Sequence, residues 1–152
     1  MRFVPAVAAL LLLTACSGAS PNEPVTDEQM AAIHASLRWA EAPSGRHYGC
    51  AEQRLGAETK GDELVVYLYT VCGAWRSGTC SADSMDSGSS SAAVVRLRGQ
   101  TVASKQFPGD GSQYAADIKS WFPKGLRGRA LSPGNGVSGR LVRAAALDSG
   151  CT

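Results

Sequence analysis

The sequence lacks an excess of charge of either sign and also lacks any close pair of cysteines. Its 15 Lys and Arg residues nearly balance 13 Asp and Glu residues, which gives a formal net charge of +2. So small a charge argues against nucleic acids as partners. Zinc sites usually take cysteines in Cys-x-x-Cys pairs, and none of the five cysteines is spaced in this way. We therefore expect no nucleic-acid partner, no metal site and no cofactor.

Motifs that mark common enzyme classes are also missing. The chain has no Gly-x-Ser-x-Gly nucleophile elbow and no Walker-type loop. Residues 134–139 match Gly-x-Gly-x-x-Gly, but the thirteen residues that follow are too few for the βαβ unit that binds a dinucleotide. The two histidines, His34 in a helical pattern and His47 at the start of a strand, lack the spacing of metal ligands. Packed or half-exposed imidazoles are the expectation for both.

The first fifteen residues have the pattern of an export signal. Arg2 is followed by an apolar run from Phe3 to Leu13 and then by small residues. A charged start, a short apolar core and a small-residue cleavage site are typical of a secretory signal. The apolar run is too short to span a bilayer, which takes roughly 20 apolar residues. We expect residues 1–15 to be removed on export.

The end of this segment, Leu13-Thr14-Ala15-Cys16, resembles the lipobox of bacterial lipoproteins. The resemblance implies that Cys16 is diacylglyceryl-modified, becomes the new N-terminus and anchors the protein in a membrane of the cell envelope, outside the cytoplasm. An ordinary secretory signal with a chance cysteine at the cleavage site is the alternative. Residues 16–25 are then the lipidated cysteine and a flexible tether, and residues 26–152 form a single domain.

The rest of the chain predicts an α+β fold. Thr26 and Gln29 are spaced as a capping box at the start of a helix, and Pro123 ends a second helical pattern. The expected order is an N-terminal helix, an antiparallel meander of about four strands, a C-terminal helix and an irregular, disulfide-tethered tail. The predicted elements are a helix from Thr26 to near Pro43, strands over 47–59 and 63–75, a loop over 77–91, a hairpin of 94–98 with 101–107, a helix over 112–122 and an irregular tail from 124 with one short element near 141–147.

Once Cys16 is assigned to lipid, Cys50, Cys72, Cys80 and Cys151 remain. An even number of cysteines in an exported chain predicts two disulfides. A three-residue turn at 60–62 would set Cys50 directly opposite Cys72, at a distance that a disulfide can bridge. This register favours Cys50–Cys72 with Cys80–Cys151. The pairing Cys72–Cys80 with Cys50–Cys151 stays open.

Two surface features are candidates for binding. Tyr67, Tyr69 and Trp75 share one face of the 63–75 strand and would form a stacking platform if that face were uncovered. The alternative is that the 112–122 helix covers them with Tyr114, Ile118 and Trp121. The second candidate is a basic set on the 94–107 hairpin, suited to an anionic membrane or envelope polymer unless it is simply a solvated face. Its members are Arg96, Arg98 and Lys105.

These features together favour a non-enzymatic, lipid-anchored extracytoplasmic surface domain. Its expected partners are the membrane through the N-terminal lipid and either an anionic envelope polymer or a neighbouring surface protein. The alternative is an exported hydrolase that acts on cell-wall or peptide substrates. A cleft that brings His34 or His47 within hydrogen-bond reach of an Asp and a Ser would favour the hydrolase.

Overall fold

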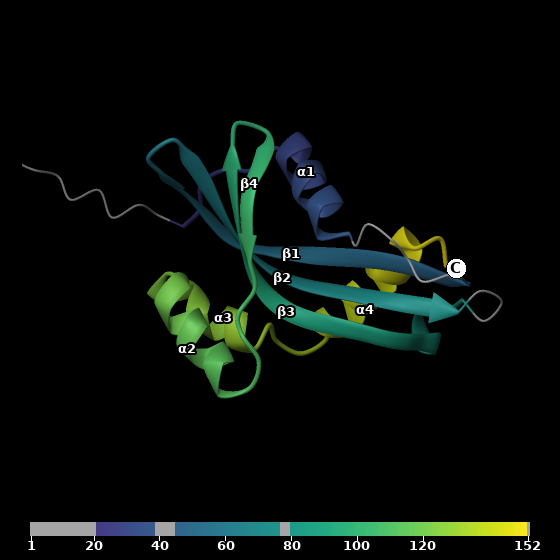
Figure 1. Cartoon of the computed structure of the whole chain (residues 1–152). Helices are drawn as coiled ribbons and strands as arrows, with labels where there is room; N and C mark the ends of the chain where they lie inside the picture. Colours follow the sequence, from purple (N-terminus) through teal and green to yellow (C-terminus); the bar gives the residue numbers. More distant parts are fainter. Residues whose placement is uncertain (1–20, 39–44, 77–79, 152) are drawn as a thin grey trace, which may run out of the picture.

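The computed structural model describes residues 21–38, 45–76 and 80–151. It confirms an α+β fold, in which helices pack on one antiparallel sheet with strand order β1-β2-β3-β4 (Figure 1). Each strand pairs with the next along the chain, so the sheet is the expected meander. In chain order the elements are α1 (Asp27–Leu37), β1 (Arg46–Lys60), β2 (Glu63–Arg76), η1 (Ala82–Ser84), β3 (Met85–Arg98), β4 (Thr101–Gln106), α2 (Ser112–Trp121), η2 (Lys124–Leu126), α3 (Arg127–Leu131) and α4 (Val137–Asp148).

Helix α1 begins with the predicted capping box. The Thr26 hydroxyl accepts a hydrogen bond from the Gln29 backbone N–H, and the Gln29 side chain accepts one from the Thr26 N–H. The helix ends at Leu37, earlier than the expected end near Pro43, which lies outside the described residues. Ile33 and Leu37 are buried and pack α1 against the sheet.

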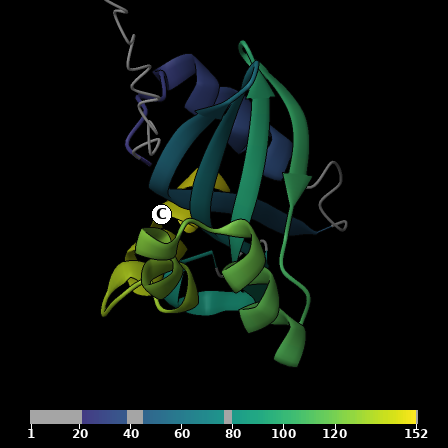
Figure 2. The ribbon, with the colours of Figure 1, turned by 90° about the vertical axis from the view of Figure 1, so that its left-hand side faces the viewer.

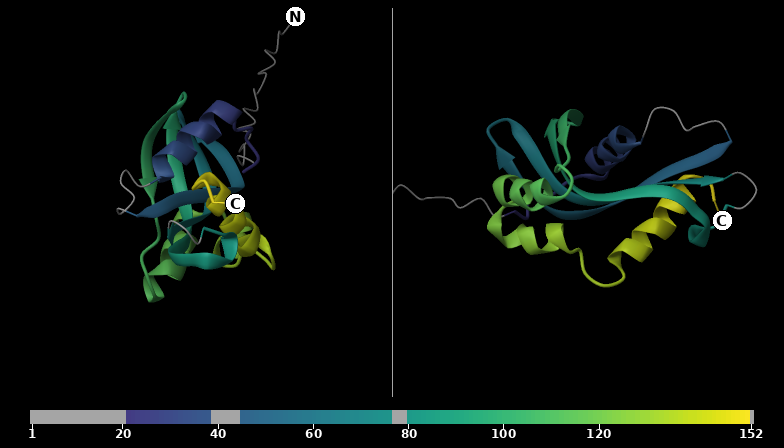
Figure 3. Two further views of the ribbon diagram at one scale, coloured as in Figure 1. Left: turned by 90° about the vertical axis from the view of Figure 1, so that its right-hand side faces the viewer. Right: turned by 60° about the horizontal axis from the view of Figure 1, so that its bottom comes forward.

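Helices cover both faces of the sheet, because strand β2 is apolar on both. Val66 and Leu68 lie in a core beneath α1, whereas Tyr67 and Trp75 lie in a second core beneath α2, α3 and α4. We call these two sides the α1 face and the α4 face. Figure 2 and the right-hand view of Figure 3 show α1 on one side of the sheet and the other helices on the opposite side. Burial on both faces makes β2 the centre of the fold.

The C-terminal tail is more regular than expected. Instead of one short element near 141–147, it contains α4, a helix of 12 residues that packs along β1 and β2. The glycine-rich segment at 134–139 leads into this helix, and Gly136 takes a left-handed conformation (φ 79°) at its N-cap. Alanines and small residues gave this helix a weak apolar signal, and packing on the sheet supplies its stability.

Both disulfides of the favoured pairing are present, although the turn that was expected to align Cys50 with Cys72 is different. Lys60 pairs with Glu63, so the turn has two residues and not three. A β-bulge at Leu55 then adds one residue to β1 and restores the register in which Cys50 faces Cys72. The second disulfide joins Cys151, three positions beyond the end of α4, to Cys80 in the segment that precedes η1.

The expected loop over 77–91 is wrong for residues 85–91, which form the first half of β3. Serine and glycine have little tendency to form strands by themselves. Here β2 acts as a template, and Ser91 to Ser87 pair with its residues from Thr70 to Ala74. Gly73 and Gly88 pair with each other. The sulfur of Met85 fills the space where a Cβ atom of either residue would lie, so both positions favour glycine.

The chain before α1 is attached to the edge of β1. The Glu23 N–H donates to the carbonyl of Ala57 at 3.0 Å, and the Ala57 N–H donates to the carbonyl of Pro21 at 2.8 Å. Val25 packs at the border of the core beneath α1. Residues 21–25, expected to be part of a flexible tether, therefore belong to the domain, and residues 16–20 lie outside the described residues.

The close approach of α4 to β1 depends on Gly49. A Cβ atom at Gly49 would lie 2.0 Å from the Ala145 carbonyl oxygen and 2.7 Å from the Ser149 nitrogen. Both are backbone atoms, so neither can rotate away. We predict that Gly49→Ala lowers the free energy of unfolding by about 1–3 kcal/mol, the usual effect of overpacking, in urea unfolding of the oxidised chain.

Gly139→Ala is the matched control for this substitution. Gly139 lies in α4, is exposed, and has no atom within 4 Å of the position of an added Cβ. Because alanine is the better helix former, we expect this variant to be more stable by about 0.5–1 kcal/mol. A Gly49→Ala variant as stable as the wild type would contradict the packing of α4 on β1.

Candidate functional site

The aromatic platform suggested by the sequence does not exist as a surface. Tyr67, Tyr69 and Trp75 are only 1%, 8% and 0% exposed. The alternative, coverage by the helix at 112–122, is confirmed in part: Ile118 of α2 is buried in this core with two further α2 side chains against it, and α4 also packs along β2 on the same face. Phe122, which follows α2, adds a ring 5.1 Å from that of Tyr67. These aromatic side chains stabilise the fold and are not available to a ligand.

The polar end of Tyr67 is also satisfied within the protein. Its hydroxyl donates a hydrogen bond to the carboxylate of Glu58, and Lys60 lies 2.7 Å from that carboxylate. Burial and the negative charge of Glu58 raise the pKa of Tyr67 well above its usual range. This group therefore serves as a neutral donor inside the core.

The expected basic patch is also wrong. The sequence placed Arg96, Arg98 and Lys105 on one face of the hairpin, but a β-bulge between Arg96 and Leu97 shifts the register and sets Lys105 opposite Val95. A shift of one residue moves a side chain to the other face. Lys105 therefore lies on the α1 face, where it donates to the Ser36 carbonyl at the end of α1.

The two arginines stay on the hairpin but are neutralised by acidic neighbours. Arg98 lies 3.1 Å from a carboxylate oxygen of Glu63 and 3.7 Å from one of Asp62, and Arg96 lies 3.7 Å from Glu63. The acids come from the β1–β2 turn and the start of β2, next to the hairpin. This end of the sheet therefore presents mixed charge and not a cationic surface.

His34 is the centre of a cluster that the sequence did not reveal. Its Nδ1 lies 3.0 Å from a Glu52 oxygen, and its Nε2 lies 3.0 Å from an Asp148 oxygen. The second oxygen of Asp148 accepts a hydrogen bond from the Cys50 N–H at 3.0 Å, and Arg38 lies 3.6 Å from it. We call His34, Glu52 and Asp148 the His34 cluster. It joins α1, β1 and the end of α4 around one edge of the sheet.

The electrostatics of the His34 cluster favour a charged imidazole. Burial opposes this charge, but Glu52 and Asp148 outweigh the effect of burial and raise the pKa of His34. Burial also opposes ionisation of Asp148, but hydrogen bonds from Cys50 and His34 outweigh it and lower the pKa of that carboxyl. Two carboxylates thus contact one imidazole and favour its protonated form.

This geometry does not match a Ser-His-Asp arrangement. Such a triad needs one imidazole nitrogen on a carboxylate and the other on the nucleophile, whereas both nitrogens of His34 contact carboxylates. The other histidine, His47, contacts the carbonyl oxygen of Ser149 through Nδ1. Within the described ranges, neither imidazole hydrogen-bonds a serine hydroxyl. The His34 cluster is therefore a structural contact that links α1 to β1 and to the end of α4.

The two edges of the sheet differ in how their backbone groups are covered. On the β1 edge, the Asp148 carboxylate caps the Cys50 N–H, Arg129 donates to the Leu55 carbonyl, and the segment before α1 pairs with Ala57. On the other edge, β4 pairs only with residues 94–98 of β3. No strand of the described chain pairs with the outer edge of residues 86–91, which we call the open edge.

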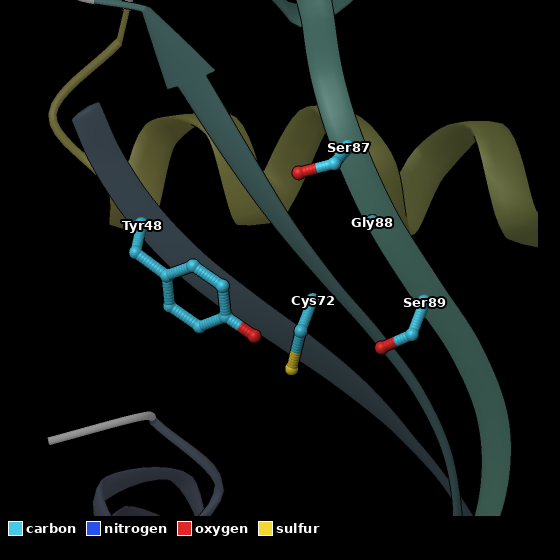
Figure 4. A pocket seen from close by; sticks show the side chains of 5 residues that line it. All are labelled: Tyr48, Cys72, Ser87, Gly88 and Ser89. Atoms are coloured by element: carbon cyan, nitrogen blue, oxygen red, sulfur yellow. The ribbon is translucent and has the colours of Figure 1, made fainter. Parts of the chain in front are cut away.

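Two hollows border the open edge. One, of about 220 Å³, lies on the α1 face, where α1 does not cover the sheet. Figure 4 shows Tyr48, Cys72, Ser87 and Ser89 in front of the strands around it, with α4 crossing behind. The other, of about 300 Å³, lies beyond the edge itself. It is lined by Ser89, Ser90, Ser91, Phe107, Pro108, Asp110 and Tyr114. Exposed backbone and these hollows make the open edge the candidate binding site.

Other kinds of site find no support in the described part of the chain. No three His, Cys, Asp or Glu side chains within residues 21–38, 45–76 and 80–151 are placed to hold a metal ion. No helix in those ranges is long and apolar enough to cross a membrane. Comparisons with protein families, curated proteins and solved structures find no match to this chain. Cys16 lies outside the described residues.

The His34 cluster predicts how stability depends on pH. The pKa of His34 is higher in the folded protein than its ordinary value of about 6.5. Its contribution is therefore fully present below about pH 6.5 and is lost as the pH rises through the folded pKa. We predict that His34→Gln lowers the free energy of unfolding by about 1 kcal/mol near pH 6 and by much less near pH 8.5, in urea titrations.

Glu52→Gln provides the control for this effect. It removes one of the two carboxylates that face His34 but leaves the imidazole and Asp148 in place. We expect a pH dependence between those of the wild type and His34→Gln. A His34→Gln variant whose stability differs from the wild type by the same amount at both pH values would contradict a stabilising contact between protonated His34 and the two carboxylates.

Proposed function

We propose that this protein is a lipid-anchored extracytoplasmic domain that acts by binding a neighbouring protein. The observation that carries the proposal is the Leu13-Thr14-Ala15-Cys16 motif in front of a domain with two disulfides. Disulfides persist in oxidising compartments and are rare in the cytosol. The motif and the disulfides therefore both favour a location outside the cytoplasm.

The place where the chain enters the domain supports this arrangement. Pro21 follows Cys16 by five positions, so an anchor at Cys16 would lie within about 18 Å of Pro21, which bonds Ala57 on the β1 edge. The open edge is at the other end of the sheet. Ala57 pairs with Val66, whereas Ser91 and Ser87 pair with Thr70 and Ala74, about 13 Å and 26 Å further along β2 at roughly 3.3 Å per residue. The open edge would thus face away from the membrane.

Binding has more support than hydrolysis. The histidine with an acidic neighbour, His34, has both nitrogens on carboxylates, which leaves none for a nucleophile. An anionic envelope polymer has less support than a protein partner, because Arg96 and Arg98 are paired with acids and Lys105 lies on the other face. A neighbouring surface protein is therefore the partner that we propose.

Replacement of Cys16 tests the anchor. In a bacterial host, we predict that the wild-type chain fractionates with membranes and is released by detergent, because the acylated Cys16 holds it there. Cys16→Ser removes the acylated thiol, so this variant should appear in the soluble extracytoplasmic fraction. Immunoblots of the fractions and metabolic labelling with palmitate measure both effects.

Ser17→Ala is the matched control for that experiment, since it changes the neighbouring hydroxyl and keeps the cysteine. It should stay in the membrane fraction and take up label. A Cys16→Ser variant that stays with membranes would contradict the lipid anchor.

A further inference from the structure

We propose that the open edge binds an extended peptide segment of a neighbouring protein as an additional strand of the sheet. This inference rests on the proposed function, because it names the partner chemistry of the same surface. In strand addition, main-chain hydrogen bonds supply affinity and the side chains beside the groove supply specificity. The open edge provides both elements.

The direction of the backbone groups follows from contacts on either side of the open edge. The Ala92 N–H points away from β2, because it donates to the Tyr114 hydroxyl at 3.1 Å. Backbone groups alternate in direction along an antiparallel strand. Gly88 and Ser90 therefore also present their N–H and C=O groups outward, where no strand of the described chain pairs with them. An extended peptide is the ligand that matches this alternating row of donors and acceptors.

The hollow beyond the edge favours a single strand over a whole sheet. Ser89 to Ser91 form one wall, and the segment after β4, Phe107 to Asp110, forms the other. The Tyr114 hydroxyl, which bonds both Ala92 N–H and the Ala130 carbonyl, closes one end. A second copy of this chain would bring its own sheet and helices up to residues 107–110, which line the hollow, whereas an extended peptide brings neither.

The side chains around the hollow indicate what the peptide carries. Phe107 is 45% exposed, and it lines the hollow together with Pro108. An apolar side chain of the peptide would cover it. Asp110 in the same wall gives a place for a basic side chain. We therefore expect a peptide of alternating apolar and small polar residues with a lysine or arginine near one end.

The open edge also lacks the usual protection against pairing. Proteins protect exposed edges with proline, with charged side chains on the strand or with a covering element. Residues 87–91 contain neither proline nor a charged side chain. All of them except Ser91 are exposed. Asp86 lies at the end of the edge, and its carboxylate forms ion pairs with the guanidinium groups of Arg46 at 2.8 Å and Arg76 at 3.1 Å. The β1 edge has partners at Cys50, Leu55 and Ala57, whereas no strand of the described chain pairs with residues 86–91.

A synthetic peptide tests the inference directly. The probe is the C-terminally amidated heptapeptide Thr-Val-Thr-Val-Thr-Val-Lys with fluorescein at its N-terminus, titrated with the chain as purified in detergent, whether or not Cys16 is acylated. We expect saturable binding by fluorescence anisotropy. A version with N-methyl groups on alternate residues keeps one free edge and should still bind. A version with N-methyl groups on all residues has no donor for the open edge and should lose binding.

Substitution of Ser90 tests the same contact from the protein side. Ser90→Pro removes an outward N–H, and proline is tolerated on an edge strand where its missing donor faces solvent. We expect this variant to bind the probe about ten-fold more weakly. Ser90→Ala removes only the hydroxyl, keeps the N–H and should bind within about two-fold of the wild type. Urea unfolding of both variants separates a loss of the contact from a loss of the fold.

Several outcomes would overturn the inference. They are the absence of saturable binding, binding that survives N-methylation of all residues, and equal affinities of Ser90→Pro and Ser90→Ala. A concentration-dependent dimer in sedimentation that Ser90→Pro abolishes would identify a second copy as the occupant and would also overturn it. The measurement in detergent does not depend on whether Cys16 holds the chain in a membrane. Failure of the lipid anchor and failure of the open edge are therefore distinguishable.

Discussion

The register between β1 and β2 is the constraint on which the rest of the structure depends. It places Cys50 opposite Cys72, and the disulfide then prevents the slip of one residue that would exchange the two faces of β1. The same register leaves Gly49 beneath α4 and turns the Cys50 N–H outward to Asp148 at the end of that helix. Through Asp148, the position of β1 also determines where His34 and α1 lie.

This constraint makes the sheet asymmetric. The β1 edge carries the segment before α1, the Asp148 carboxylate and the Arg129 guanidinium, which bond backbone groups of Ala57, Cys50 and Leu55. The opposite edge is paired by β4 for only part of its length, because β4 is short and the chain then turns away towards α2. The contacts along β1 and the unpaired stretch of β3 make the β3 side of the sheet the place where an added strand meets no element of the described chain. Under the proposed anchor, the open edge faces away from the membrane.

Local patterns in the sequence predicted much of the fold. The capping box at Thr26, the apolar alternation of β2 and the pairing of the cysteines were all correct. The errors arise where one residue changes a register or where tertiary contacts replace propensity. A bulge at Leu55 and another near Arg96 leave no mark in the sequence, and the second of them moved Lys105 to the other face.

The candidate site was the least predictable part. The strand formed by residues 85–91 reads as a loop because serine and glycine depend on β2 as a template. The His34 cluster joins residues that are 114 positions apart, so no spacing rule reveals it. The one signal in the sequence was an uninterrupted stretch without charge or proline after Asp86. Such a stretch is compatible with an exposed strand as well as with a loop.

Amide hydrogen exchange tests the asymmetry of the two edges most directly. If the outer edge of residues 86–91 is open, the outward amides of Gly88 and Ser90 exchange rapidly. The amides of Ser89 and Ser91, which face β2, then exchange more slowly. The Cys50 amide, also outward but bonded to Asp148, should be protected in spite of its place on an edge strand. Equal protection of Gly88, Ser89, Ser90 and Ser91, or rapid exchange at Cys50, would contradict a sheet with one capped edge and one open edge.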